Sequence, residues 1–137
     1  MKIVQETSLI IRLSNLIRPL MRFLFPKMNE KDKEYKEITL NIIANLLGIG
    51  NAATPLGLKA MKTMQEKNTK KDTVTDSMAM FIVLNTASLQ IIPTTVIAVR
   101  ASMGSENPAQ IILPVWIVTI ITDITGIVAS KILMKKF

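Results

Sequence analysis

Three long stretches of the chain are almost free of charge, and strongly charged segments separate them. The stretches cover 38–58, 77–99 and 109–130, and Asp123 is the single charged residue within them. An ionised group in hydrocarbon costs at least ~2.5 kcal/mol on insertion scales, so membrane proteins separate charge from apolar sequence in this way. Each stretch also reaches the ~20 residues that a helix needs to cross a bilayer. The pattern predicts an all-α, polytopic membrane protein.

The segment 1–26 has the pattern of an amphipathic helix. Apolar residues recur at helical spacing on one side, polar and basic residues occupy the other, and Pro26 ends the helix. Such a helix suits either the surface of an anionic membrane or the rest of its own protein, and both remain open. The apolar positions are Leu9, Leu13, Leu16, Ile17, Leu20 and Leu24.

The middle of 38–58 is poorly suited to a continuous helix. Asn51 or Thr54 could cap a second half-helix, with Pro55 in its first turn. We therefore expect two half-helices that meet at a break. The residues that favour turns and caps are Gly48, Gly50, Asn51, Thr54, Pro55 and Gly57.

The distribution of Lys and Arg predicts the topology. Eight precede residue 38, five lie in 59–76, one lies between the last two stretches and three follow residue 130. The positive-inside rule places the first, second and last of these groups in the cytoplasm. The stretches 77–99 and 109–130 then cross the membrane, whereas 38–58 begins and ends on one side. We expect 38–58 to form a re-entrant helical hairpin.

Composition argues against an enzyme. The chain contains no Cys and no His, which excludes disulfides, thiol catalysis, Ser-His-Asp hydrolysis and the commonest metal ligand. The net charge of +7 is confined to segments beside apolar stretches, and aromatic residues are scarce. We expect no catalytic residues, no metal, no cofactor and no nucleic acid partner, and we expect membrane lipids as neighbours.

Three long motifs resemble the spore maturation protein A family. They are PLMRFLFP at 19–26, NLLGIGNAATPLGLKAM at 45–61 and LNTASLQIIPTTVIAVRASMGSENP at 84–108. The resemblance implies that 27–137 is a gate-type membrane domain of the nucleoside-recognition kind. It also implies a multi-pass protein of the forespore or mother-cell membrane, which acts with spore maturation protein B, or a related membrane subunit, in dehydration of the spore core. Family members usually carry further hydrophobic sequence before the position of Met1, so 1–26 is alternatively the remainder of a membrane helix.

Polar residues inside the apolar stretches are the candidate functional residues. They could line a path for a small polar solute, as in a transporter or channel gate, or only hold helices or a partner together. A homo-oligomer is also possible. Asp123 is a candidate for proton or cation coupling, or a hydrated structural residue. The candidates for the lining or gate are Asn51, Thr54, Pro55, Asn85, Thr86, Ser88 and Gln90.

Overall fold

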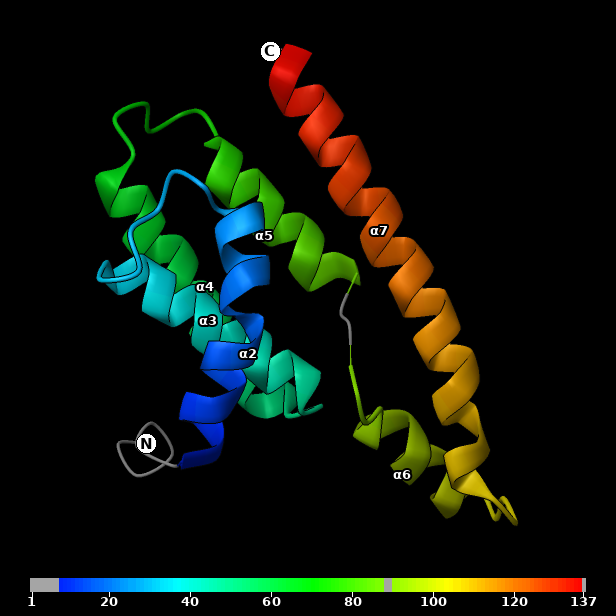
Figure 1. Cartoon of the computed structure of the whole chain (residues 1–137). Coiled ribbons are helices and arrows are strands. Elements are labelled where there is room, and N and C mark those ends of the chain that lie inside the picture. The colour runs from blue at the N-terminus through cyan, green and yellow to red at the C-terminus, as the bar shows by residue number, and fades with distance from the viewer. Residues whose placement is uncertain (1–7, 88–89, 137) are drawn as a thin grey trace.

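The computed structural model describes residues 8–87 and 90–136, and in this part of the chain every regular element is a helix. The all-α prediction is confirmed for these residues. In chain order the helices are α2 (Ser8–Leu24), α3 (Lys33–Leu46), α4 (Gly50–Lys67), α5 (Asp76–Ala87), α6 (Thr94–Ser102), the 3₁₀ turn η1 (Pro108–Ile111) and α7 (Ile112–Lys136) (Figure 1).

Helices α3 and α4 form an antiparallel hairpin, which is the most extensive helix pair in the described residues (Figure 1). Gly48 ends α3 with a φ of 69°, a left-handed conformation that costs a residue with a Cβ ~1–2 kcal/mol. The N–H of Gly48 donates to the carbonyl of Asn45 at 2.9 Å, and the N–H of Ile49 donates to the carbonyl of Ala44 at 2.9 Å. This pair of bonds is the Schellman motif, which satisfies the last carbonyls of a helix. The expected break therefore exists.

The break lies earlier than the capping residues suggested. It covers 47–49, and Ile49 precedes α4 without a side-chain cap. Asn51, Thr54 and Pro55 are all inside α4, and the Thr54 hydroxyl donates to the carbonyl of Gly50 at 3.3 Å. The capping roles expected for Asn51 and Thr54 are wrong, because glycine at the end of α3 makes the turn. Both arms of the hairpin also extend beyond 38–58.

The expected continuous helix over 77–99 is divided into α5 and α6. Pro93 has no N–H and disfavours a helical conformation in the residue before it. The freed backbone instead bonds to the hairpin turn: the N–H of Ile91 donates to the carbonyl of Leu46 at 2.8 Å. The Thr94 hydroxyl donates to the carbonyl of Gly48, also at 2.8 Å. The segment 91–94 is therefore attached to the hairpin turn.

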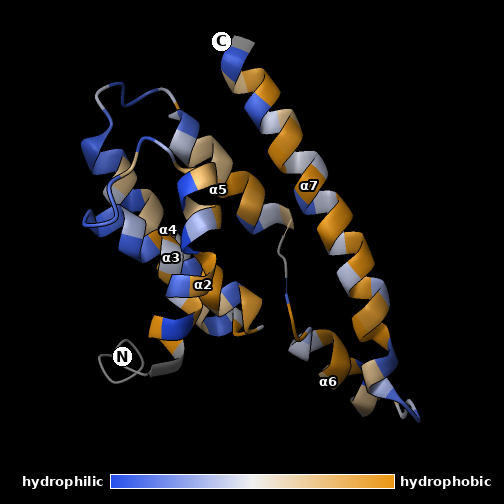
Figure 2. Ribbon diagram, in the orientation of Figure 1, coloured by the Kyte–Doolittle hydropathy of each residue, from blue (hydrophilic) through white to orange (hydrophobic). Residues whose placement is uncertain are grey.

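Helix α7, with η1, contains the apolar stretch expected at 109–130. Residues Pro108–Lys135 are long and apolar enough to cross a membrane, and within the described residues no other helix meets both conditions. Its side chains are largely exposed, and Figure 2 shows a mostly hydrophobic helix with a hydrophilic C-terminal end. The described residues thus contain one helix that could cross a membrane, whereas the polytopic prediction requires at least two.

A buried apolar core joins α2, α3 and α5 at one end of the molecule. Met21, Phe25, Ile38 and Met80 are each at most 1% exposed. The charged connections 25–32 and 68–75 lie towards the same end as the C-terminus of α7, and the turn between α6 and η1 lies at the opposite end (Figure 1). These two charged connections and the C-terminal end of α7 therefore lie on one side of the helical domain.

Candidate functional site

Three asparagines form a hydrogen-bonded network where α3, α4 and α5 meet. Asn45 Nδ2 donates to Asn85 Oδ1 at 3.1 Å and to Asn41 Oδ1 at 3.4 Å. Asn41 Nδ2 donates to the carbonyl of Ala53 at 2.8 Å, and Asn85 Nδ2 donates to the carbonyl of Phe81 at 2.9 Å. Buried amides need such partners, because an unpaired buried polar group costs ~1–3 kcal/mol. The network therefore ties the hairpin to α5.

Gly57 gives the network its space. A Cβ at this position would lie 3.0 Å from Asn41 Nδ2 and 3.8 Å from Asn85 Oδ1. Asn41 itself is 1% exposed, so its amide has little room to move aside. A side chain on α4 at residue 57 would press against the two amides. The absence of a side chain there allows α4 to approach α3 and α5.

Two cavities open on different faces of the hairpin, one of about 510 Å³ and one of about 530 Å³. The cavity of about 530 Å³ adjoins the asparagine network between α4 and α5. Four residues that the sequence singled out line this cavity, and they come from α4, α5 and the segment after α5. They are Thr54, Asn85, Thr86 and Gln90. The structure thus brings together more than half of the expected polar lining, although its role in binding stays a prediction.

The remaining candidates lie elsewhere. Asn51 and Pro55 are exposed on α4, and neither belongs to the described lining of this cavity. The amide that meets Asn85 is that of Asn45 and not that of Asn51. Ser88 falls outside the described residues. The polar lining therefore includes Thr54 near the start of α4 but not Asn51 or Pro55.

Asp123 on α7 lies on the other side of the asparagine pair. It lines a third cavity, of about 200 Å³, together with Asn45 and Asn85. Its Oδ2 atom is buried and accepts no hydrogen bond from the described residues. The rest of the wall is apolar, with Leu20, Leu24, Ile42, Leu46, Leu84, Ile120, Ile124 and Ile127. The candidate acid therefore faces the bundle and not open solvent.

Comparison with curated proteins identifies the family. The chain is 38% identical over 131 residues to spore maturation protein A of Bacillus subtilis (strain 168), and the match covers 96% of this chain and 67% of that protein. The chain belongs to the spore maturation protein A family. No family model matches the chain, and no solved structure matches it.

Two network residues of this spore maturation protein A family member were missed by the sequence analysis. Asn41 and Asn45 both lie in the charge-free stretch 38–58 and are four residues apart. This spacing places both amides on one face of a helix. Two amides on one face of an apolar helix need polar partners, and that signal could have identified them.

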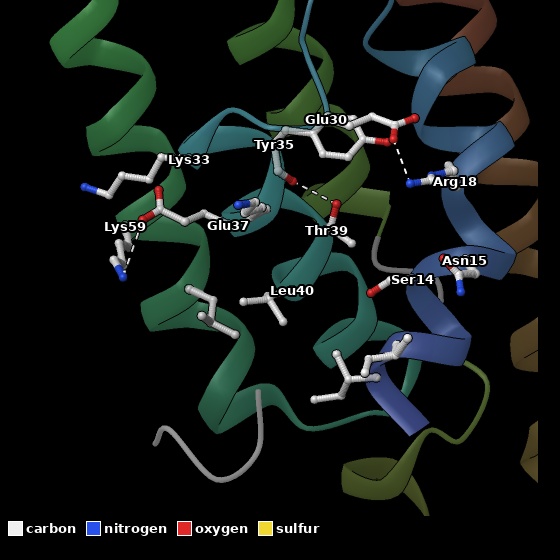
Figure 3. Close-up of a pocket in the computed structure, with 14 residues that line it drawn as sticks. Ser14, Asn15, Arg18, Glu30, Lys33, Tyr35, Glu37, Thr39, Leu40 and Lys59 are labelled. Atoms are coloured by element: carbon white, nitrogen blue, oxygen red, sulfur yellow. Dashed lines mark hydrogen bonds and ion pairs between the residues drawn. The ribbon is translucent and has the colours of Figure 1, made fainter. Parts of the chain in front are cut away.

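The family member also has a charged cleft of about 510 Å³ between α2, α3 and α4 (Figure 3). Arg18 pairs with Glu30 at 2.8 Å across its upper edge, and Lys59 pairs with Glu37 at 3.4 Å across the hairpin. Glu37 is 5% exposed, so its carboxylate depends on this lysine for compensation. The first pair attaches α2 to the connection before α3, and the second joins α3 to α4.

A second ion pair joins the same two helices farther along the hairpin. Lys67 Nζ donates to Glu34 Oε1 at 2.7 Å. This hydrogen bond raises the pKa of Lys67 above its usual value of 10.5, against the opposing effect of desolvation. The described residues contain no group of three or more His, Cys, Asp or Glu side chains suited to a metal ion.

Proposed function

We propose that this chain is an integral membrane protein of spore maturation that contributes to dehydration of the spore core together with spore maturation protein B. The observation that carries the proposal is the 38% identity to spore maturation protein A of Bacillus subtilis over 96% of the chain. The long apolar helix α7 supports a place in a membrane. The proposed location is the forespore or mother-cell membrane, with the charged connections in the cytoplasm.

In this proposal the hairpin is the functional core of the domain and enters the membrane from the cytoplasmic side. Both outer ends of the hairpin lie near charged connections, and its turn is attached to the segment after α5. Broken backbone within a bilayer is stable where other protein groups satisfy it. The bonds from Ile91 and Thr94 to the turn are of this kind.

Complementation in Bacillus subtilis tests the proposal. The strain to use lacks its own spore maturation protein A and expresses either this chain or a chimera, in which this chain replaces the matched region of the native protein. The readout is spore buoyant density, which rises as core water falls. We expect the chimera to restore the density of spores with the native protein. Density equal to that of the empty-vector strain for both proteins would contradict the proposal, provided that both are present in the membrane fraction.

The partnership with spore maturation protein B has its own test. We expect spore maturation protein B to co-purify with this chain from detergent-solubilised membranes. The matched control is an unrelated membrane protein that carries the same affinity tag. Equal recovery of spore maturation protein B with both baits would contradict the partnership and would leave the complementation result to decide the role in spore maturation.

A solute gate is the second candidate function, and the polar cavity of about 530 Å³ favours it. The double variant Asn45→Ala with Asn85→Ala removes the central hydrogen bond and part of the polar lining. A gate should change the swelling rate of proteoliposomes in a glycerol gradient while the protein remains folded. A scaffold should leave the swelling rate at the level of empty liposomes in both proteins and should lose co-purification of its partner.

A further inference from the structure

Two adjoining cavities meet at the C-terminal end of α7. The first, of about 230 Å³, lies between the α2–α3 connection, the start of α5 and α7, and it contains Lys27, Lys131 and Lys135. The second, of about 400 Å³, runs along α7 towards its middle. Its wall is apolar apart from Lys131 and Lys135, which belong to both cavities, and consists of Phe23, Ile124, Ile127, Val128 and Ile132. An apolar groove is therefore continuous with a basic pocket.

The basic pocket has more positive charge than its own groups neutralise. Lys27 pairs with Asp76 at 2.8 Å, and Asp76 is the single acid in the described wall of the pocket. Lys131 donates to the carbonyl of Phe23 at 2.6 Å and lies 4.0 Å from the centre of the Phe23 ring. A lysine ammonium has three N–H donors, so two of them remain after that bond. Lys135 makes no ion pair with a described residue.

The position of the pocket along α7 restricts what can occupy it. The candidate membrane span ends at Lys135, so its final lysines lie where a crossing helix meets lipid headgroups. The exposed side chains of Val128 and Ile132, 51% and 62% exposed, continue from there into the apolar zone. A free phosphate would satisfy the lysines and leave the groove empty, whereas an acyl chain alone would leave the charge unmatched.

We propose that this end of α7 binds an anionic phospholipid, with the phosphate at Lys27, Lys131 and Lys135 and an acyl chain in the groove along α7. Because Lys27 comes from the α2–α3 connection and Lys131 and Lys135 come from α7, the bound headgroup bridges α7 to the rest of the helical domain. The lipid thereby attaches the C-terminal end of α7 to the connection that follows α2. This site adds a specific lipid to the general membrane environment of the chain.

Native mass spectrometry of the full chain in detergent tests this proposal. Phosphatidylglycerol and phosphatidylcholine with identical acyl chains are titrated against the wild-type protein and the double variant Lys131→Gln with Lys135→Gln. We expect selective phosphatidylglycerol adducts. The variant should lose about 25-fold in apparent affinity, at about fivefold for each lysine near an anionic headgroup. The control variant, Lys62→Gln with Lys70→Gln, removes the same charge from exposed positions outside both cavities and should retain the affinity.

Further arms distinguish the headgroup, the groove and a free anion. Val128→Trp fills the groove without changing charge, and we expect it to weaken phosphatidylglycerol binding as well. Equal binding of the two lipids, or equal loss in the Lys62 and Lys70 control, would overturn the site. Displacement of phosphatidylglycerol by millimolar glycerol 3-phosphate would show that a free phosphate is the ligand and would also overturn it. Helical circular dichroism identical to wild type shows that each variant tested is folded.

Discussion

Substitution of Gly48 by Ala tests whether the hairpin turn is a fixed part of the structure. Gly48 has a φ of 69°, and a Cβ added there would lie 2.2 Å from the carbonyl oxygen of Ile92. That oxygen belongs to the backbone, so a change of side-chain rotamer cannot relieve the overlap. The segment 91–94 has to move away from the turn.

The cost follows from what this movement breaks. A left-handed conformation costs a residue with a Cβ ~1–2 kcal/mol. The displaced segment also loses the bonds from Ile91 to Leu46 and from Thr94 to Gly48, both 2.8 Å long. Each is worth ~0.5–1.5 kcal/mol. We expect Gly48→Ala to lower the free energy of unfolding by about 3 kcal/mol.

Unfolding in mixed detergent micelles, followed by Trp116 fluorescence, measures this cost. Trp116 Nε1 donates to the carbonyl of Ile91 at 2.8 Å, so the fluorescence also reports movement of the displaced segment. Gly50→Ala is the matched control, because its Cβ would meet no atom within 4 Å and its φ is not left-handed. We expect the free energy of unfolding of Gly50→Ala to lie within ~0.5 kcal/mol of the wild-type value. Equal stability of the two variants would refute the reasoning about the turn.

Three further predictions concern packing and buried polar groups. Tyr35→Phe should stabilise the protein by about 1 kcal/mol, because the hydroxyl is buried with no partner among the described residues. Burial raises the pKa of Tyr35 above 10.0, so the unfolded chain ionises first and the wild type should lose stability above pH 10. Unfolding curves measured across pH should show a smaller loss in Tyr35→Phe. An unchanged pH profile would contradict this. A double-mutant cycle with Asn45→Ala and Asn85→Ala should give a coupling of ~0.6 kcal/mol in unfolding free energy, and additive effects would mean that the amides do not interact. Gly126→Ala places a Cβ 2.8 Å from Val83 Cγ1 and should lower the free energy of unfolding by about 1 kcal/mol. In a Val83→Ala background the same substitution should raise it, because alanine favours the helix and the overlap is gone. The same sign in both backgrounds would exclude contact between α5 and α7 at this point.

The sequence predicted the helices better than their ends. Long apolar stretches and charged connections indicated helices, and the Gly and Pro residues indicated a break within 38–58. The exact turn depended on Gly48 adopting a left-handed conformation next to the carbonyl of Ile92, which is a contact between distant parts of the chain. The division of 77–99 had a local signal in Pro93, but the bonds that stabilise it come from the hairpin. Hydropathy alone does not reveal such bonds.

The sequence predicted only part of the candidate site, again because contacts between distant parts of the chain decide the rest. Asn85, Thr86 and Gln90 attracted attention as polar residues in an apolar stretch, and they line a cavity with Thr54. The structure pairs Asn85 with Asn45, since the position of α3 against α5 decides which amides meet. A hydropathy pattern does not reveal which buried amides will meet.

Cysteine accessibility tests the membrane arrangement most directly, and the chain contains no native Cys that would interfere. Single cysteines replace Lys70, in the connection before α5, and Glu106, in the turn before η1; both residues are exposed and neither belongs to an ion pair of the described residues. With a membrane-impermeant maleimide, we expect Glu106→Cys to react in intact cells and Lys70→Cys to react only after the membrane is opened. Reaction of both cysteines from the same side, or recovery of the folded protein in the soluble fraction without detergent, would contradict the account.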